Sequence, residues 1–388
     1  MAVALEERAD EILAANARDM EAGAAADIGS ALLDRLRLTD ERLAGIASDV
    51  RVIASLPDPV GETIEGHRLP NGLDVRKVRV PLGVVAVVYE ARPNVTIDCS
   101  ALCIKSGNAI VLRGSSIAAH SNAVLAAVAR SALESAGLPS ASVSLVAGGG
   151  REELGELATQ SSFVDLIIPR GGEGLKEALK AVATVPVMYA AAGNCHVFVD
   201  ESASVDDAVA IAVNAKVQRP GVCNAAETLL VHSGVAPEFL PRVLPALRER
   251  GVELRVDART RSLAGALGDS LGEAVEEDWA TEYLALVLAV KVVDSVEEAI
   301  EHVNRYGSGH SEAIVTGSVD AAQAFTSDVD AAAVYVNAST RFTDGGVFGM
   351  GAEIGNSTQK LHARGPIGVR ELCTFKYVIE GNGQVRPG

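Results

Sequence analysis

The sequence contains few cysteines and no long apolar run. It has five cysteines, scattered over 388 residues. The odd number argues against a disulfide framework, and the scattered spacing does not match the ligand spacing of a zinc site. No apolar run approaches the roughly 20 residues needed to cross a bilayer. The amino-terminal segment has acidic residues and helical periodicity instead of the basic start and apolar centre of a signal peptide. We therefore expect a cytoplasmic protein without a metal site or a membrane anchor.

The chain also lacks an excess of positive charge and two common phosphate-binding motifs. A net charge of −17 argues against nucleic acid or an anionic membrane as the main partner. An acidic surface still leaves room for a local basic pocket that binds an acidic ligand. Neither the G-x-G-x-x-G pattern nor the Walker A pattern occurs, so any dinucleotide site must be built in another way.

What is present is the pattern of an α/β protein. Apolar residues recur at helical spacing over 1–57, and Asn71-Gly72 between two alternating runs predicts a hairpin within 68–83. From residue 83 onward, short apolar strands alternate with Ala- and Leu-rich helices, which indicates a parallel sheet covered on both faces.

The predicted strands form two blocks. The first block holds 83–90, 108–114, 142–148, 164–171, 185–191 and 196–200, and the second holds 227–232, 284–293, 312–317 and 332–337. The repetition predicts an α/β protein with two stacked domains, each with an open and mostly parallel sheet. A late strand within 372–385 is expected to return to the first domain or to a neighbouring subunit.

Ligands of an open parallel sheet bind at the carboxyl ends of its strands. In the first block these ends carry YEARPN (89–94), LRGSS (112–116) and PRGGEG (169–174). Arg113, Ser115 and Ser116 can donate hydrogen bonds to a ribose 2′-phosphate. Gly171 and Gly172 open a helix pattern whose free N–H groups can meet a pyrophosphate. An arginine after a strand is also often a solvated loop charge, and a glycine pair is often only a tight turn.

One cysteine lies where a nucleophile would be expected. The stretch VQRPGVCNAAETLLV (217–231) places Cys223 in a Pro-Gly turn between a helix pattern and a β-rich run, flanked by small residues. A buried apolar role is the alternative for any cytosolic cysteine. Cys195 stands beside His196 at a strand start, and we interpret it as a packing residue. Cys99 and Cys103 lie on one apolar helix pattern and are expected in the core.

Four longer segments carry a resemblance to a known family, namely 81–98, 103–116, 301–316 and 347–368. Over about residues 66–385 the chain resembles the aldehyde dehydrogenase superfamily, and most closely its γ-glutamyl phosphate reductase family. The most specific segment is EHVNRYGSGHSEAIVT (301–316), because other aldehyde dehydrogenases lack its His310-Ser311-Glu312.

The resemblance implies three regions, including a small β extension that pairs subunits. Residues 1–200 would form an NADPH-binding domain, with the hairpin 62–80 in the oligomerisation extension. Residues 201–350 would form the catalytic domain that holds Cys223. Residues 351–388 would return to the cofactor domain and form the oligomerisation tail. A homo-oligomer, either a dimer or a dimer of dimers, is implied as well.

The resemblance also implies a reaction: NADPH-dependent reduction of L-glutamyl 5-phosphate to L-glutamate 5-semialdehyde, with release of phosphate, in proline biosynthesis. Cys223 would attack the acyl phosphate and carry a thioester, while its backbone N–H and the Asn94 side chain would stabilise the oxyanion. Asn94 equally fits a cap of the helix that begins near Val95. A functional link to glutamate 5-kinase, which would supply the acyl phosphate, is a further expectation.

Cofactor and substrate residues follow from the same resemblance. Lys105 and Glu282 match residues that contact the cofactor ribose in the superfamily, and Arg113 with its serines favours NADPH over NADH. Glu282 also fits a solvated carboxylate at a strand start. For the charged groups of the substrate, the candidate partners are Arg170, Arg219, His310, Glu312 and Arg341, whose individual roles the sequence does not sort.

One departure from the superfamily pattern points to the direction of the chemistry. Hydrolysing aldehyde dehydrogenases carry a glutamate that activates water, and alignment on Gly193 places Ala191 at that position. Without this base the thioester should survive, as an acyl-phosphate reductase requires. Two alternatives stay open. Another aldehyde dehydrogenase would act without phosphate, and a non-catalytic binding protein would hold cofactor while Cys223 resists alkylation.

Overall fold

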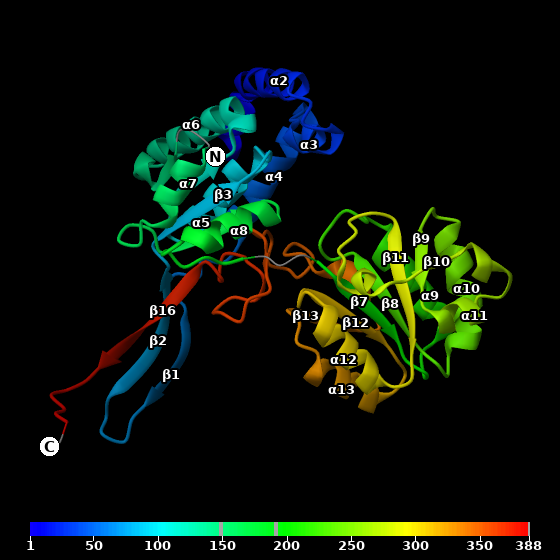
Figure 1. Cartoon of the computed structure of the whole chain (residues 1–388). Coiled ribbons are helices and arrows are strands. Elements are labelled where there is room, and N and C mark those ends of the chain that lie inside the picture. Colours follow the sequence, from blue (N-terminus) through cyan, green and yellow to red (C-terminus); the bar gives the residue numbers. More distant parts are fainter. Residues whose placement is uncertain (147–149, 190–192, 387–388) are drawn as a thin grey trace. The chain divides into compact units, whose positions relative to one another are not determined.

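The computed structural model describes residues 1–146, 150–189 and 193–386. They form two compact units (Figure 1). Unit 1 comprises Met1–Tyr189, Gly349–Gly355 and Leu361–Gly388, and unit 2 comprises Ala190–Phe348 and Asn356–Lys360. The division therefore falls after Tyr189 and not at residue 200 as predicted. The reason is that the strand at 195–199 pairs with strands of the second sheet.

Unit 1 begins with four helices, as the periodicity of 1–57 predicts: α1 (Ala2–Glu7), α2 (Ala9–Ala25), α3 (Ser30–Leu36) and α4 (Asp40–Ser55). Thr39 caps α4, because its hydroxyl accepts a hydrogen bond from the backbone N–H of Arg42. Asp19 of α2 is buried, and its carboxylate accepts hydrogen bonds from the backbone N–H groups of His120 and Ser121 at the start of α6 (Ala119–Ser135). This contact ties the amino-terminal helices to the rest of unit 1.

The central sheet of unit 1 is parallel and has the strand order β5-β4-β3-β6. The strands of this sheet are β3 (Val84–Tyr89), β4 (Ala109–Gly114), β5 (Val143–Leu145) and β6 (Leu166–Arg170). The other helices of unit 1 are α5 (Asn94–Lys105), α7 (Arg151–Ala158), α8 (Glu173–Val182), η1 (Ser116–Ala118) and η2 (Ser140–Ser142). The segment 185–191 was predicted as a strand. Within the described residues it makes one isolated bridge, from Val187 to Ile167.

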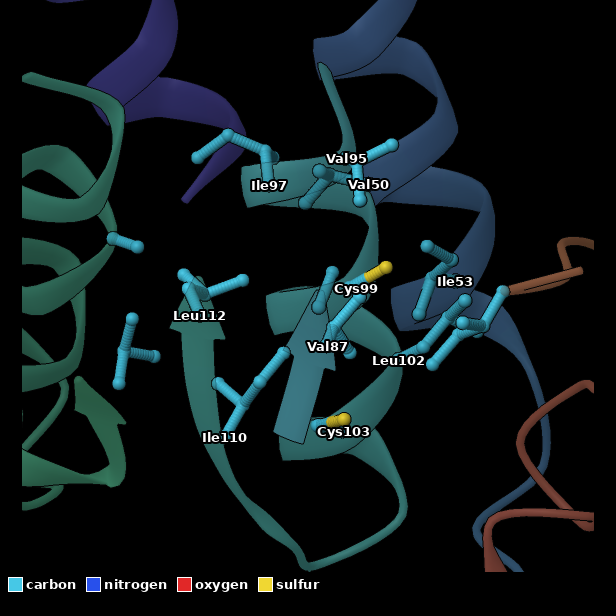
Figure 2. Close-up of a cluster of buried hydrophobic side chains, with 14 of the residues drawn as sticks. Val50, Ile53, Val87, Val95, Ile97, Cys99, Leu102, Cys103, Ile110 and Leu112 are labelled. Carbon is cyan, nitrogen blue, oxygen red and sulfur yellow. The ribbon is translucent and has the colours of Figure 1, made fainter. Parts of the chain in front are cut away.

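Alternation along β3 separates two layers of core. Val85 and Val87 pack with α4, α5 and α6, whereas Ala86 and Val88 pack with α7 and α8. Figure 2 shows part of the first layer, with the thiols of Cys99 and Cys103 among aliphatic side chains. Burial in this layer raises the pKa of Cys99 to about 12. The prediction that these two cysteines belong to the core is confirmed.

A separate antiparallel sheet extends from unit 1 as an arm (Figure 1). It consists of β1 (Thr63–Arg68), β2 (Asp74–Pro81) and β16 (Cys373–Glu380), in the order β1-β2-β16. The predicted hairpin turn is present. Gly72 has a φ of +89°, and the backbone N–H of Leu69 donates to the carbonyl of Leu73 at 2.8 Å. The two-residue Gly365–Pro366 strand (β15) also belongs to unit 1.

Unit 2 has a seven-stranded parallel sheet in the order β10-β9-β11-β8-β7-β12-β13. The strands are β7 (Cys195–Val199), β8 (Ala226–His232), β9 (Glu253–Val256), β10 (Gly272–Glu273), β11 (Val287–Val293), β12 (Ser311–Val315), β13 (Ala333–Val336) and, apart from this sheet, β14 (Asn356–Ser357). The helices are α9 (Val205–Val217), α10 (Ala236–Arg248), α11 (Ala258–Leu263), α12 (Val296–Tyr306), α13 (Val319–Asp328), η3 (Gly265–Ser270), η4 (Glu276–Ala280) and η5 (Thr340–Phe342).

Both faces of this sheet are covered, as the continuous apolar strands predict. One face packs on α9 and α10 and the other on α12 and α13. The predicted fold class, an aldehyde dehydrogenase-like α/β fold with two parallel sheets and a small β extension, is confirmed. None of the helices described is both long and apolar enough to cross a membrane. No cluster of His, Cys, Asp or Glu among the same residues is arranged to hold a metal ion.

Candidate active site

Cys223 lies in the loop that joins the end of α9 to the start of β8. It is the exposed member of the five cysteines, all of which are described, whereas Cys99, Cys103, Cys195 and Cys373 are buried. The thiol of Cys195 donates to the carbonyl of Cys223 at 3.2 Å, and burial raises the pKa of Cys195 well above its usual range. Cys195 therefore supports the loop as a packing residue, and Cys223 is the accessible thiol.

The backbone of Gly193 packs directly on the backbone of Cys223. A Cβ atom at Gly193 would overlap the carbonyl group and Cα of Cys223, so this contact requires glycine. The N–H of Gly193 donates to Oε1 of Glu282 at 2.6 Å. Glu282 thus lies beside the backbone that supports Cys223. Cys195, Cys223 and Glu282 all lie just before or at the start of β7, β8 and β11, three neighbouring strands, so they gather at the amino-terminal edge of the sheet.

Two arginines lie near Cys223. The Nε of Arg341 donates to Oε1 of Gln218 at 2.8 Å, which holds this half-buried guanidinium against the loop. Burial lowers the pKa of Arg341, the Arg219 guanidinium lowers it further, and the Cys223 side chain acts in the opposite direction. The structure therefore brings Arg219, Arg341 and Cys223 together, and the resulting positive patch is suited to an anionic substrate.

His310 and Glu312 are both buried in unit 2. Glu312 accepts hydrogen bonds from the backbone N–H of His196 at 2.7 Å and from its ring at 3.0 Å, so its carboxylate is engaged inside the unit. His310 contacts the hydroxyl of Ser311, which contacts Thr343. Because the carbonyl of Thr343 accepts from Asn224 at 2.8 Å, this network reaches the residue next to Cys223.

In unit 1, three predicted loops meet at one sheet edge. Tyr89 at the end of β3 is in register with Gly114 of β4 and with Arg170 of β6. The strand order reverses between β3 and β6, which is the topological switch point where ligands of such sheets bind. Arg113 is buried with its Nη2 on the carbonyl of Gly150, and its Nε has no hydrogen-bond partner among the described residues.

The serines and glycines of these loops differ in their availability. Ser116 is exposed, while the hydroxyl of Ser115 accepts from the backbone N–H of Ala91 at 3.3 Å. Gly172 precedes α8, and its N–H donates to Oε2 of Glu90 at 3.2 Å. Gly171 is packed against the same carboxylate. The helix start predicted for a pyrophosphate is therefore already met by a carboxylate of the chain.

Asn94 is the first residue of α5 and not its cap. Pro93 holds the cap position, and no side chain caps the helix. The Nδ2 of Asn94 donates to Oδ2 of Asp98 at 2.9 Å, one turn further along. Burial raises the pKa of Asp98 to about 7, although the hydrogen bond from Asn94 opposes this shift. Arg170 also faces Asp98 and lies against the backbone of Gly355.

Lys105 does not lie with the other predicted cofactor residues. It ends α5, the helix that runs from the carboxyl end of β3 back to the start of β4, so it lies at the opposite edge of the sheet from Arg113. Its Nζ donates to the carbonyl of Ala54 at 3.0 Å. The predicted ribose contact at Lys105 is therefore not supported by its position. Ala191 lies outside the described residues.

Sequence reasoning missed a buried ion pair beside the loop that carries Cys223. Lys216 and Glu227 contact each other through Nζ and Oε2, and both side chains are fully buried. Each stands within an apolar run, and a charged residue in such a run signals a buried partner, because lone charges are almost never fully buried. The pattern IAVNAKVQ followed by AAETLLV carried that signal.

Comparisons with known proteins agree with this architecture. The chain matches the aldehyde dehydrogenase family over residues 4–265 and 275–378. It is 55% identical over 386 residues to a gamma-glutamyl phosphate reductase of Thermobifida fusca, covering 100% of this chain and 91% of the relative. A relative of the same name from Moorella thermoacetica is 54% identical, also with 100% and 91% covered.

Solved structures extend the comparison. The crystal structure of gamma-glutamyl phosphate reductase from Thermotoga maritima is 48% identical and has a TM-score of 0.97, covering 100% of this chain and 92% of that one. An acetylating aldehyde dehydrogenase from Geobacillus thermoglucosidasius, 20% identical with a TM-score of 0.66, covers 100% and 94% and shares the fold. The chain therefore belongs to the aldehyde dehydrogenase family, and within it to the gamma-glutamyl phosphate reductases.

Proposed function

We propose that this chain reduces L-glutamyl 5-phosphate to L-glutamate 5-semialdehyde, using NADPH and releasing phosphate. The name shared by its relatives specifies a γ-glutamyl phosphate as their substrate. The observation that carries the proposal is the exposed Cys223, which stands on a loop fixed by Gly193 and flanked by two arginines. An accessible thiol beside positive charge is suited to attack an anionic acyl phosphate.

The covalent step uses residues of unit 2. The thiolate of Cys223 attacks the acyl carbon, a C–S bond forms, and the C–O bond to phosphate breaks, so that phosphate leaves with the bonding electron pair. The developing oxyanion needs a fixed donor, and the backbone N–H of Cys223 is our candidate. The role of Asn94 as a second donor stays a prediction of the family resemblance. Arg219 and Arg341 are our candidates to bind the phosphate or the α-carboxylate.

A nicotinamide dinucleotide fits the residues at the carboxyl edge of the unit 1 sheet. The buried Nε of Arg113, without a partner among the described residues, and the exposed Ser116 offer donors to a 2′-phosphate, which favours NADPH. Ser115, Gly171 and Gly172 lie on the same edge, and Glu282 is our candidate for the nicotinamide ribose. The cofactor supplies the hydride that reduces the thioester. Overall, the acyl phosphate, NADPH and a proton are converted to the aldehyde, NADP⁺ and phosphate.

The direction of the reaction follows from a sequence feature. Ala191 stands where hydrolysing relatives carry the glutamate that activates water, so we infer that water cleaves the thioester slowly. The substrate must come from a kinase that phosphorylates the side-chain carboxylate of glutamate, such as glutamate 5-kinase. We also propose a homo-oligomer that pairs through the β1-β2-β16 sheet, and a reducing cytoplasm, which suits five cysteines without a disulfide.

The reverse reaction tests this proposal. Glutamate semialdehyde and NADP⁺ are supplied with and without inorganic phosphate, and nicotinamide absorbance is followed. We expect turnover that requires phosphate, because phosphate must attack the thioester and displace the Cys223 thiolate from the acyl group. Turnover without phosphate would instead show that water cleaves it, and the chain would be a hydrolysing aldehyde dehydrogenase. No turnover, together with an unreactive Cys223, would favour a non-catalytic binding protein.

A further inference from the structure

The buried ion pair of Lys216 and Glu227 closes the base of the catalytic loop. Lys216 is in the last turn of α9 and Glu227 is in the first residues of β8, so the pair joins the two ends of the loop that carries Cys223. Both side chains are fully shielded from solvent. A buried ion pair is often no more stabilising than apolar residues of the same size. Stability alone therefore does not explain why charged residues stand here.

The second carboxylate oxygen of Glu227 holds another loop. Oε1 of Glu227 accepts a hydrogen bond from the backbone N–H of Leu284 at 3.2 Å. Leu284 has a φ of +52°, in the left-handed region that a leucine rarely adopts. The residue is 46% exposed, so packing contributes little to this conformation. The hydrogen bond to Glu227 is thus the contact that holds the strained residue.

The residue between Glu282 and Leu284 is fixed by the same surroundings. The hydroxyl of Tyr283 donates to Oδ1 of Asp278 at 2.8 Å. Its ring lies 5.9 Å from Nζ of Lys216 and 5.2 Å from the Arg255 guanidinium. Of the two residues after Glu282, Tyr283 is therefore anchored by Asp278, with Lys216 near its ring, and Leu284 is anchored by Glu227. Glu282 itself reaches Gly193, whose backbone lies on Cys223.

We propose that Glu227, held by Lys216, is a positioning residue that fixes Glu282 relative to Cys223 through the backbone of Leu284. Its acceptor oxygen is the required feature, and Lys216 keeps that oxygen turned toward Leu284. The inference rests on the proposed function in one respect, the contact of Glu282 with the cofactor. The tests below use binding and thiol reactivity, which do not depend on turnover.

Two double variants separate the acceptor from the charge pair. Lys216→Met with Glu227→Gln removes the charges and keeps an acceptor for Leu284, whereas Lys216→Met with Glu227→Leu removes both. The dissociation constant of NADPH is measured from its fluorescence, and the alkylation rate of Cys223 by iodoacetamide is measured in parallel. We expect the glutamine variant to bind NADPH within about twofold of the parent chain and the leucine variant about tenfold more weakly, as for one lost hydrogen bond to a charged group. The alkylation rate should change in the leucine variant only. Equal constants and equal rates in the two variants would overturn the proposal.

Glu282→Gln distinguishes this inference from the proposed function. Glu282→Gln is also combined with the leucine variant. If Glu282→Gln alone weakens NADPH binding about tenfold and the combined variant binds no more weakly, Glu227 acts through Glu282 as proposed. If Glu282→Gln leaves binding unchanged while the leucine variant still alters alkylation, the positioning role stands and the cofactor role of Glu282 fails. Should the leucine variant not fold or bind NADPH weakly, Leu284→Gly is added to it, and Ala285→Gly added in the same way is the control. A glycine adopts a positive φ without strain, so position 284 no longer needs the hydrogen bond to Glu227. Recovery of NADPH binding with Leu284→Gly and not with Ala285→Gly supports the proposal, and no recovery with either overturns it.

Discussion

The backbone N–H of Gly193 donates a 2.6 Å hydrogen bond to Oε1 of Glu282, while the Cα of Gly193 lies against the backbone of Cys223. One glycine therefore joins the loop of the exposed thiol to the loop of the predicted ribose-binding carboxylate. Gly193 makes both contacts with its own backbone atoms, to the Glu282 side chain on one side and to the Cys223 backbone on the other. The geometry of the unit 2 site should consequently depend on this residue more than on any single surface charge.

Gly193→Ala should lower kcat/KM by about 100-fold, because the added Cβ overlaps Cys223 and must displace the nucleophile by a fraction of an ångström to an ångström. Steady-state kinetics measure the loss of activity, and thermal unfolding measures separately any loss of stability. Gly45→Ala, in the exposed part of α4, is the matched control, since a Cβ there meets no atom within 4 Å. Equal kinetics for the two variants would show that the contact of Gly193 with Cys223 does not matter for the reaction.

Iodoacetamide should label one thiol per native chain, and that thiol should be Cys223. The reason is exposure: the other four cysteines are buried, and burial raises the pKa of Cys99, Cys103 and Cys195. Peptide mass mapping after partial alkylation identifies the site. Cys223→Ser should abolish labelling and reduce activity by at least about 1000-fold, as expected when a nucleophile is removed. Cys373→Ser, in the buried start of β16, should retain both properties; preferential labelling of any other cysteine would contradict the assignment.

Asp98 should make stability depend on pH between about 4 and 7. Burial keeps its carboxyl neutral in the folded chain up to a pKa of about 7, whereas an unfolded aspartate ionises near pH 4. Unfolding therefore releases a proton within this window, and the group lowers the free energy of unfolding as the pH rises through it. Asp98→Asn keeps an acceptor for Asn94 and removes the charge. It should stabilise the protein at pH 8 and have little effect at pH 4, as measured by urea unfolding.

The exposed Asp269 provides the comparison for this pH effect. Asp269→Asn should change the free energy of unfolding by the same small amount at both pH values, because this side chain is exposed to solvent in the folded chain as it is in the unfolded chain. If Asp98→Asn behaved in the same way, the carboxyl of Asp98 would not be held neutral by its surroundings.

Much of the fold could be predicted because strands with both faces buried are continuously apolar. The runs that became β3, β4 and β8 lie within one or two residues of their predicted bounds. The run at 185–191 is equally apolar, yet in the described part it forms a single bridge at Val187. Local composition does not decide whether a partner strand is available. The same limit explains why β9, which follows a predicted helix region with mixed polarity, was not predicted.

The candidate site could be predicted where a single residue and its local sequence indicate a chemical role. It could not be predicted where the role depends on neighbours in three dimensions. Cys223 was identified from its loop, and the family resemblance gave Glu282. The position of Lys105 at the wrong end of α5 follows from the direction of a helix, which residue matching ignores. Lys216 and Glu227 each stand within an apolar run, which signals a buried charge, but the run does not show which residue is the partner. Only their joint burial shows that they form a pair.

The arm formed by β1, β2 and β16 should pair with a second copy of the chain. Within the described residues, β1 and β16 are the outer strands of this sheet, and unpaired outer strands invite association. Alternate residues of β16, namely Phe375, Tyr377 and Ile379, are 44%, 56% and 55% exposed and form an apolar stripe. Tyr377→Glu with Ile379→Glu places two charges on this stripe and should lower the oligomeric state, as measured by light scattering after size exclusion. Lys376→Glu, on the opposite face of the strand, should leave it unchanged. A parent chain that is monomeric at micromolar concentration would rule out this interface, and dissociation by both variants would mean that charge, and not the apolar stripe, controls association.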